Sequence, residues 1–146
     1  MYEKYLDVRK VIRCVEHKKK LDEVASNLKK ELIDSMNASD FQKSAFSLDQ
    51  NTDGLITLKI DIYDIEITFK ERLIVINDVP LLKFTGEYDD GDCLKETTCF
   101  FLGKNALVYV DEYKPNPSYD YNDSSLFLEI TASVLKSLKS VGRISY

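Results

Sequence analysis

The chain has 146 residues, of which 44% are hydrophobic and 31% are charged. This length and composition are typical of one globular domain, and they exclude a disordered chain, a collagen-like repeat and a small disulfide scaffold. Its 20 Lys and Arg against 25 Asp and Glu give a net charge of −5, which argues against direct nucleic-acid binding, because phosphate attracts an excess of positive charge. We therefore expect a single acidic domain spanning residues 1–146.

Residues 3–36 lack Gly and Pro and are predicted to be helical, with apolar residues at helical spacing in two stripes. The stripes are Tyr5, Val8, Val11, Ile12 and Val15, and then Leu21, Val24, Ala25, Leu28, Leu32, Ile33 and Met36. They do not join cleanly, because lysines occupy positions 18–20. A single helix would extend about 50 Å, too long for a compact domain of this size, so we favour two helices broken near residues 17–20. The alternative is one long helix that projects and pairs with a second chain.

The middle of the chain is predicted to form β-strands. The expected strands cover residues 41–48, 55–62, 65–69, 73–76, 81–85, 98–102 and 106–111. In the second of these, Ile56, Leu58, Ile60 and Ile62 alternate with polar residues and should share one face. The alternation changes phase at residues 63–64, which indicates a turn or a bulge.

A second helix is expected near the C-terminus, after a polar loop at residues 114–123. Asp123 or Ser124 is a suitable N-cap, and Gly142 a suitable C-cap. The apolar stripe of this helix is Phe127, Ile130, Val134, Leu138 and Val141. Because the strands do not alternate with helices, the sequence predicts an α+β fold, in which N-terminal helices and a C-terminal helix pack on one face of an antiparallel β-sheet of about five or six strands.

The N-terminal residues do not have the pattern of a signal peptide, and no apolar run is longer than five residues. We therefore expect a cytoplasmic protein that does not enter a membrane. The three cysteines, Cys14, Cys93 and Cys99, are odd in number and have no Cys-x-x-Cys spacing, so neither a disulfide framework nor a zinc site is expected.

Three motifs were weighed for chemistry, and we expect neither a bound metal nor a cofactor. Residues 49–57 match the first nine positions of an EF-hand loop, but Ile60 stands where the bidentate Glu is needed, so a β-turn at residues 51–54 is favoured. His17, the only histidine, lies in a polar stretch that does not suit catalysis. Glu112 and Lys114 have the Glu-x-Lys form of metal-dependent nucleases, with Asp78 or Asp92 as a further carboxylate.

The negative charge is concentrated in residues 85–123, which hold nine acidic and three basic residues, together with five of the nine tyrosines. Grouped acidic residues attract basic partners, and Tyr is enriched at binding hot spots. The predicted partner-binding residues are Glu87, Tyr88, Asp89, Asp90, Asp92, Asp111, Glu112, Tyr113, Tyr119, Asp120, Tyr121 and Asp123.

Small size, the lack of a catalytic set and this acidic segment together favour a non-enzymatic interaction protein. The leading hypothesis is an immunity or inhibitor protein, monomeric or homodimeric, that binds and neutralises a basic toxin or nuclease. The first alternative is a dimeric secretion chaperone or adaptor that presents a sheet edge or a helix groove to its client. The second alternative is a metal-dependent nuclease-like enzyme.

Overall fold

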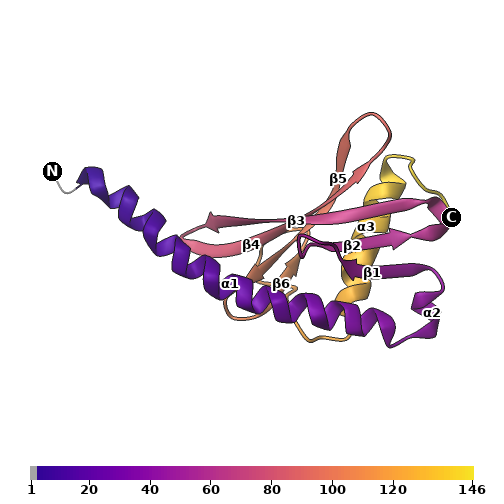
Figure 1. Cartoon of the computed structure of the whole chain (residues 1–146), viewed down its shortest axis with the longest axis horizontal. Coiled ribbons are helices and arrows are strands. Elements are labelled where there is room, and N and C mark those ends of the chain that lie inside the picture. Colours follow the sequence, from indigo (N-terminus) through magenta and orange to yellow (C-terminus); the bar gives the residue numbers. More distant parts are fainter. Residues whose placement is uncertain (1–2) are drawn as a thin grey trace.

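The computed structural model describes residues 3–146 and shows an antiparallel sheet with two long helices packed on one of its faces (Figure 1). A 3-10 turn, η1 (Glu3–Tyr5), leads into α1 (Leu6–Asn37), and the short α2 (Asp40–Lys43) precedes the sheet. The strands are β1 (Phe46–Gln50), β2 (Ile56–Ile60), β3 (Ile65–Ile76), β4 (Val79–Asp89), β5 (Leu94–Gly103), β6 (Leu107–Val110) and β7 (Tyr119–Asp120). The last helix is α3 (Leu126–Ser140).

The seven strands pair in chain order, each antiparallel to its neighbour, so the predicted α+β class is confirmed. The sheet is larger than the predicted five or six strands. The expected segments 65–69 and 73–76 form one strand, β3. The additional strand, β7, has two residues, lies inside the loop expected to be irregular, and pairs its Tyr119 with Val108. A strand this short has no alternation of its own to reveal it.

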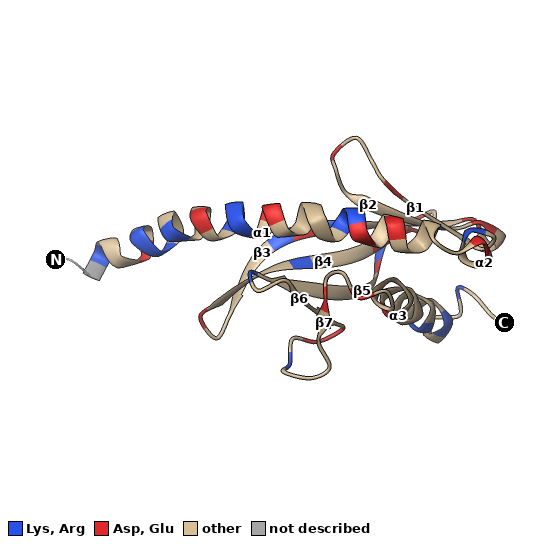
Figure 2. Cartoon of the chain, turned by 90° about the horizontal axis from the view of Figure 1, so that it is seen from below, with Lys and Arg blue, Asp and Glu red and all other residues tan. Residues whose placement is uncertain are grey.

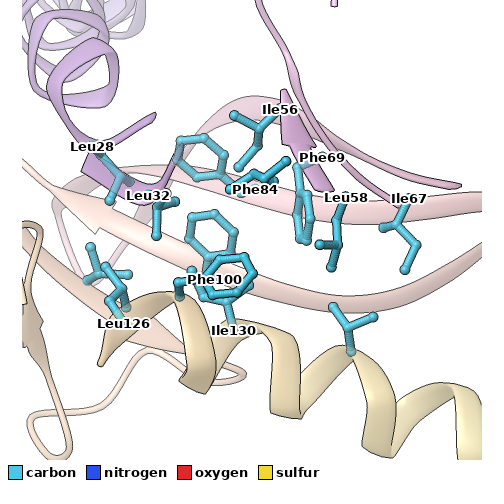
Figure 3. Packing of buried hydrophobic residues seen from close by; sticks show 14 of the residues in the cluster. Leu28, Leu32, Ile56, Leu58, Ile67, Phe69, Phe84, Phe100, Leu126 and Ile130 are labelled. Carbon is cyan, nitrogen blue, oxygen red and sulfur yellow. The ribbon is translucent and has the colours of Figure 1, made fainter. Parts of the chain in front are cut away.

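One large hydrophobic core lies between the sheet and the two helices, as predicted. The second half of α1 contributes Leu21, Leu28 and Leu32, and α3 contributes residues such as Ile130. At the centre, the rings of Phe84 and Phe100 stack with centroids 4.5 Å apart (Figure 3). Such aromatic side chains bury 150–250 Å² each and dominate the energetics of a core.

The predicted phase change between β2 and β3 is confirmed. A 3-10 turn, η2 (Asp61–Tyr63), ends at Asp64, whose φ of 53° is left-handed, and the buried alternation then resumes in β3. Ile62 was wrongly predicted to share the buried face of β2. It lies in η2 and is 82% exposed, because the strand ends at Ile60.

The predicted strand at residues 41–48 is only partly correct. Residues 40–43 form α2, in which the Ser39 hydroxyl accepts a hydrogen bond from the amide of Gln42, and Phe41 is exposed. The ladder with β2 starts only at the pair Phe46 and Ile60. Local capping therefore outweighs the strand propensity of Phe41.

The β1–β2 connection is the predicted β-turn. The Gly54 amide donates to the carbonyl of Asn51 at 3.0 Å, and the Asn51 side chain accepts from two amides of the same loop. Ile60, at the twelfth position of the EF-hand pattern, is buried in the core.

The favoured break of the first helix near residues 17–20 is wrong, because α1 is continuous from Leu6 to Asn37. Nothing in this stretch opposes a helix, and Lys18 forms an (i, i+4) ion pair with Asp22 at 2.9 Å. The compactness argument fails because the first half of α1 projects beyond the sheet (Figure 1).

The C-terminal helix is confirmed with shifted ends. Its N-cap residue is Ser125 rather than Asp123 or Ser124, although the Asp123 carboxylate accepts from the Ser125 amide at 2.9 Å. At the other end, Gly142 is left-handed and its amide donates to Lys139, while the amide of Arg143 donates to Leu138. These two bonds form a Schellman motif, which fits the expectation that Gly142 ends the helix.

Candidate functional site

The acidic residues predicted to bind a partner fall into separate groups. Glu87, Asp89, Asp90 and Asp92 lie on the β4–β5 hairpin, whereas Asp111 and Glu112 follow β6. The ladder pairs Asp89 with Leu94, while the Asp111 side chain reaches Thr98. Thr98 lies four positions after Leu94 in β5, which is about 14 Å along a strand. Asp120 and Asp123 lie further on, in the segment that leads into α3.

The hairpin carboxylates fix the turn that presents them. Asp89 accepts from the amide of Gly91 at 2.8 Å, and Asp90 accepts from the amides of Asp92 and Cys93, each at 3.0 Å. The two hydrogen bonds from the backbone amides of Cys93 and Asp92 lower the pKa of Asp90 below its ordinary value. The carboxylate of Asp90 is therefore fully charged at neutral pH.

The β4–β5 hairpin concentrates negative charge at an end of the sheet that stands clear of the body (Figure 1). Residues 87–96 hold five acidic side chains and one lysine. Glu87 lies directly opposite Glu96 in the ladder, an arrangement of like charges that destabilises a strand pair. We call residues 87–96 the acidic hairpin.

A hollow of about 420 Å³ lies beside the acidic hairpin. It is lined by hairpin residues, including Asp90 and Glu96, and by Val141 and Arg143 from the end of α3. Leu94 and Val141 expose about two thirds of their surface here. This end of the molecule therefore combines carboxylates with apolar area that a partner can bury.

The five tyrosines of the acidic segment serve mainly in packing. Tyr88 is buried in the main core, and the half-buried Tyr119 and Tyr121 pack against it. Tyr113 lies on the outer face of the sheet, with its ring 4.8 Å from that of Tyr109. The outer-face cluster also contains Leu81 and Phe101.

Asp111 is held against α3. Its backbone is left-handed, with a φ of 70°, and its carboxylate accepts hydrogen bonds from the hydroxyls of Thr98 and Ser133. A hollow of about 270 Å³, rich in hydroxyls and lined also by Lys136, borders this cluster. Sequence reasoning missed it, because its residues come from β5, the loop after β6 and α3. Beside it, burial raises the pKa of the Cys99 thiol.

The residues of the nuclease-like motif do not assemble. Asp78 and Asp92 lie in the turns at opposite ends of β4, and Glu112 pairs with Lys114 at 3.6 Å. Within residues 3–146, no three His, Cys, Asp or Glu side chains group closely enough to hold a metal ion. His17 is half-buried, and its Nδ1 lies 2.9 Å from the Nζ of Lys104 in the β5–β6 turn.

The first half of α1 forms a second distinctive surface. Tyr5, Leu6, Val8, Val11, Ile12 and Val15 are each at least half exposed. Lys and Arg recur along the same stretch (Figure 2), where residues 1–20 hold seven basic and three acidic residues. These residues therefore carry +4, and the rest of the chain carries −9. We call residues 4–20 the basic arm.

Comparisons with protein families, curated proteins and solved structures found no match to this chain. Within the part that the structure describes, no helix combines the length and the apolar character needed to cross a membrane. Function is therefore inferred from the acidic hairpin and the basic arm.

Proposed function

We propose that this protein is a cytoplasmic, non-enzymatic binding protein of the immunity or inhibitor type, which neutralises a basic protein partner such as a toxin or nuclease. One observation carries the proposal. The acidic hairpin holds five carboxylates and one lysine on ten residues that stand clear of the sheet, and it retains the opposed pair Glu87 and Glu96. A destabilising charge pair is easiest to understand where the charge itself is used.

Grouped charges add their fields. At physiological salt, such a field acts over a Debye length of about 8 Å, and it steers a basic partner toward the hairpin. The cationic substrate cleft of a nuclease is a surface of the opposite sign, to which the hairpin is complementary. After the encounter, Leu94, Val141 and the walls of the neighbouring hollow supply area for contact.

The acidic hairpin supports this role better than the rest of the acidic segment does. The Asp111 carboxylate is bonded to Thr98 and Ser133, and Glu112 already has a cation in Lys114. Of the five carboxylates of the acidic hairpin, only Asp90 has an ion pair among the described residues, with Lys95 at 3.8 Å. Tyr119 and Tyr121 are partly buried against the core. We therefore place the centre of the proposed interface at residues 87–96.

The test replaces Asp89, Asp90 and Asp92 together by Asn, which removes three charges but keeps an acceptor oxygen for the turn. The matched control, Glu23→Gln, Glu31→Gln and Asp34→Asn, removes three charges from the exposed side of α1. Partners captured from the native cell are identified, and their binding kinetics are measured at several salt concentrations. The hairpin variant should associate more slowly and with weaker salt dependence. Equal effects of both variants would show that only the net charge matters.

An adaptor or secretion chaperone is the second candidate, because the basic arm leaves an apolar face exposed. The dimeric chaperone predicts a homodimer in solution, whereas the inhibitor tolerates a monomer. Sedimentation of the full chain at several concentrations separates the two.

A further inference from the structure

The basic arm has the apolar seam of a coiled-coil helix without a partner helix. Tyr5, Val8, Ile12 and Val15 follow alternating spacings of three and four residues, which define such a seam. These four side chains are 52–63% exposed. A continuous exposed apolar stripe is typical of an interaction site.

The seam points away from the body of the protein. At 3.6 residues per turn, its centre lies roughly 150° around the helix axis from the stripe that packs on the sheet. Burial agrees with this angle, because Cys14, His17 and Lys18 are half-buried at the edge of the sheet, whereas Val15 is 53% exposed. The chain's own sheet therefore cannot cover the seam while α1 stays one helix.

The charges beside the seam disfavour pairing of the basic arm with the basic arm of a second copy of the chain. Lys4, Val11 and Lys18 flank one side of the seam, and Arg9 and Glu16 flank the other, so the flanks carry three cations and one carboxylate. An antiparallel pair that uses all four seam residues places Lys4 against Lys18 of the second copy, and Arg9 against Arg9 of the second copy. A parallel pair places Lys4 against Arg9 of the second copy. Both arrangements oppose like charges, and each arm carries +5.

We propose that the basic arm docks on an acidic amphipathic helix of a different protein, one that carries Asp and Glu beside its own apolar seam. A seam of four side chains buries little area, so the flanking charges decide the choice of partner. A lipid surface fits less well, because interfacial helices present Trp, Phe and Leu, whereas the exposed apolar side chains of this stretch are mostly Val and Ile. The proposal does not depend on the acidic hairpin.

Two designed peptides of about three heptads test the proposal on the full chain. Both carry Ile and Leu in the seam, and the flanking positions are all Glu in one peptide and all Lys in the other. Fluorescence anisotropy of the labelled peptides should show saturable binding of the Glu peptide and at least about tenfold weaker binding of the Lys peptide. Equal binding of both peptides, or no binding of the Glu peptide, would overturn the proposal.

Variants locate the contact. Ile12→Asp should weaken binding of the Glu peptide at least about tenfold, because it places a charge in the seam. The matched control Phe41→Asp alters an exposed apolar residue of α2 and should leave binding unchanged. Exchanging two of the three flanking cations, Arg9→Glu with Lys18→Glu, should reverse the preference toward the Lys peptide. Loss of binding by Phe41→Asp would contradict the assigned site.

Two further measurements test the two other possible occupants of the seam, a second copy of the chain and a membrane surface. Sedimentation of the wild-type chain should show a monomer, and a dimer that Ile12→Asp dissociates would overturn the proposal in favour of a second copy. Vesicles containing phosphatidylserine should not retain the chain. Retention that Ile12→Asp abolishes would overturn it in favour of a membrane surface.

Discussion

The two halves of α1 carry apolar residues at the same spacing and have opposite surroundings. Leu21, Leu28 and Leu32 in the second half are buried against the sheet, whereas Val8, Ile12 and Val15 in the first half are exposed. Both halves belong to one continuous helix. Helical periodicity thus identifies an amphipathic helix, but it does not tell whether the chain itself covers the apolar face.

The angle between the two apolar stripes explains why the chain's own sheet covers only one of them. One rigid helix cannot turn two stripes roughly 150° apart toward the same sheet. The lysines at positions 18–20 mark the point where the apolar face changes direction, rather than the end of a helix. The comparison predicts that the second half stabilises the protein and that the first half contributes little.

Hydrogen exchange should show the largest difference between the two halves. Amides of residues 24–32 should open with a free energy near that of global unfolding, which is about 5–15 kcal/mol for such domains. Amides of residues 8–12 should open with far less, because the side chains of this part of the helix are all exposed. Exchange measured by NMR at two protein concentrations tests this, and equal protection of both halves would contradict it.

Truncating one buried and one exposed residue should give the next largest contrast. Leu28→Ala should reduce the free energy of unfolding by about 2–5 kcal/mol, because it leaves a cavity in the core. Ile12→Ala should change it by no more than about 0.5 kcal/mol, since Ile12 is 63% exposed. Urea denaturation of both variants measures the difference. A loss above about 2 kcal/mol for Ile12→Ala would mean that the seam packs within the chain.

Removing an ion pair should cost more stability in the second half of α1 than in the first half. Lys29, in the second half, donates to Glu71 at 2.8 Å and to the Gly54 carbonyl at 2.9 Å, and both charged side chains are largely buried. Lys29→Met should destabilise the protein by about 1–3 kcal/mol, because it leaves the largely buried carboxylate of Glu71 without its cation. Adding Glu71→Leu should recover much of this loss.

The exposed pair of Lys18 and Asp22 provides the control for Lys29. Because both side chains are more than 40% exposed, Lys18→Met should cost no more than about 0.5 kcal/mol. Thermal or urea unfolding of the three variants gives the comparison. Equal losses for Lys18→Met and Lys29→Met would contradict the difference between the halves.

The sequence predicted most of the fold, because strand alternation and turn chemistry are local. The turn at Asn51–Gly54 and the phase change at Asp64 could be identified from neighbouring residues alone. The continuity of α1 could not, because it depends on which apolar face finds a tertiary partner. The hydroxyl cluster around Asp111 was likewise hidden, since Thr98 and Ser133 meet it only through tertiary packing.

The alkylation rates of the three cysteines should show the smallest difference. Cys14 lies at the junction between the two halves of α1, so its rate measures how far that junction is exposed. The exposed Cys93 should be alkylated first and the half-buried Cys14 more slowly, at the point where α1 first meets the sheet. Cys99 should react slowest, because burial raises its pKa and so reduces its thiolate fraction at a given pH. Mass spectrometry of peptides labelled with iodoacetamide gives the three rates.

The same pKa shift predicts a weak pH dependence of stability. As pH rises past about 8.5, thiols of the unfolded chain lose their protons while folded Cys99 keeps its own. The folded state then binds more protons, so stability should fall with rising pH in this range. Cys99→Ala should flatten that slope, whereas Cys93→Ala should leave it unchanged. If Cys99 instead reacts as fast as Cys93, its side chain is open to solvent, and both the order of alkylation and this pH dependence are wrong.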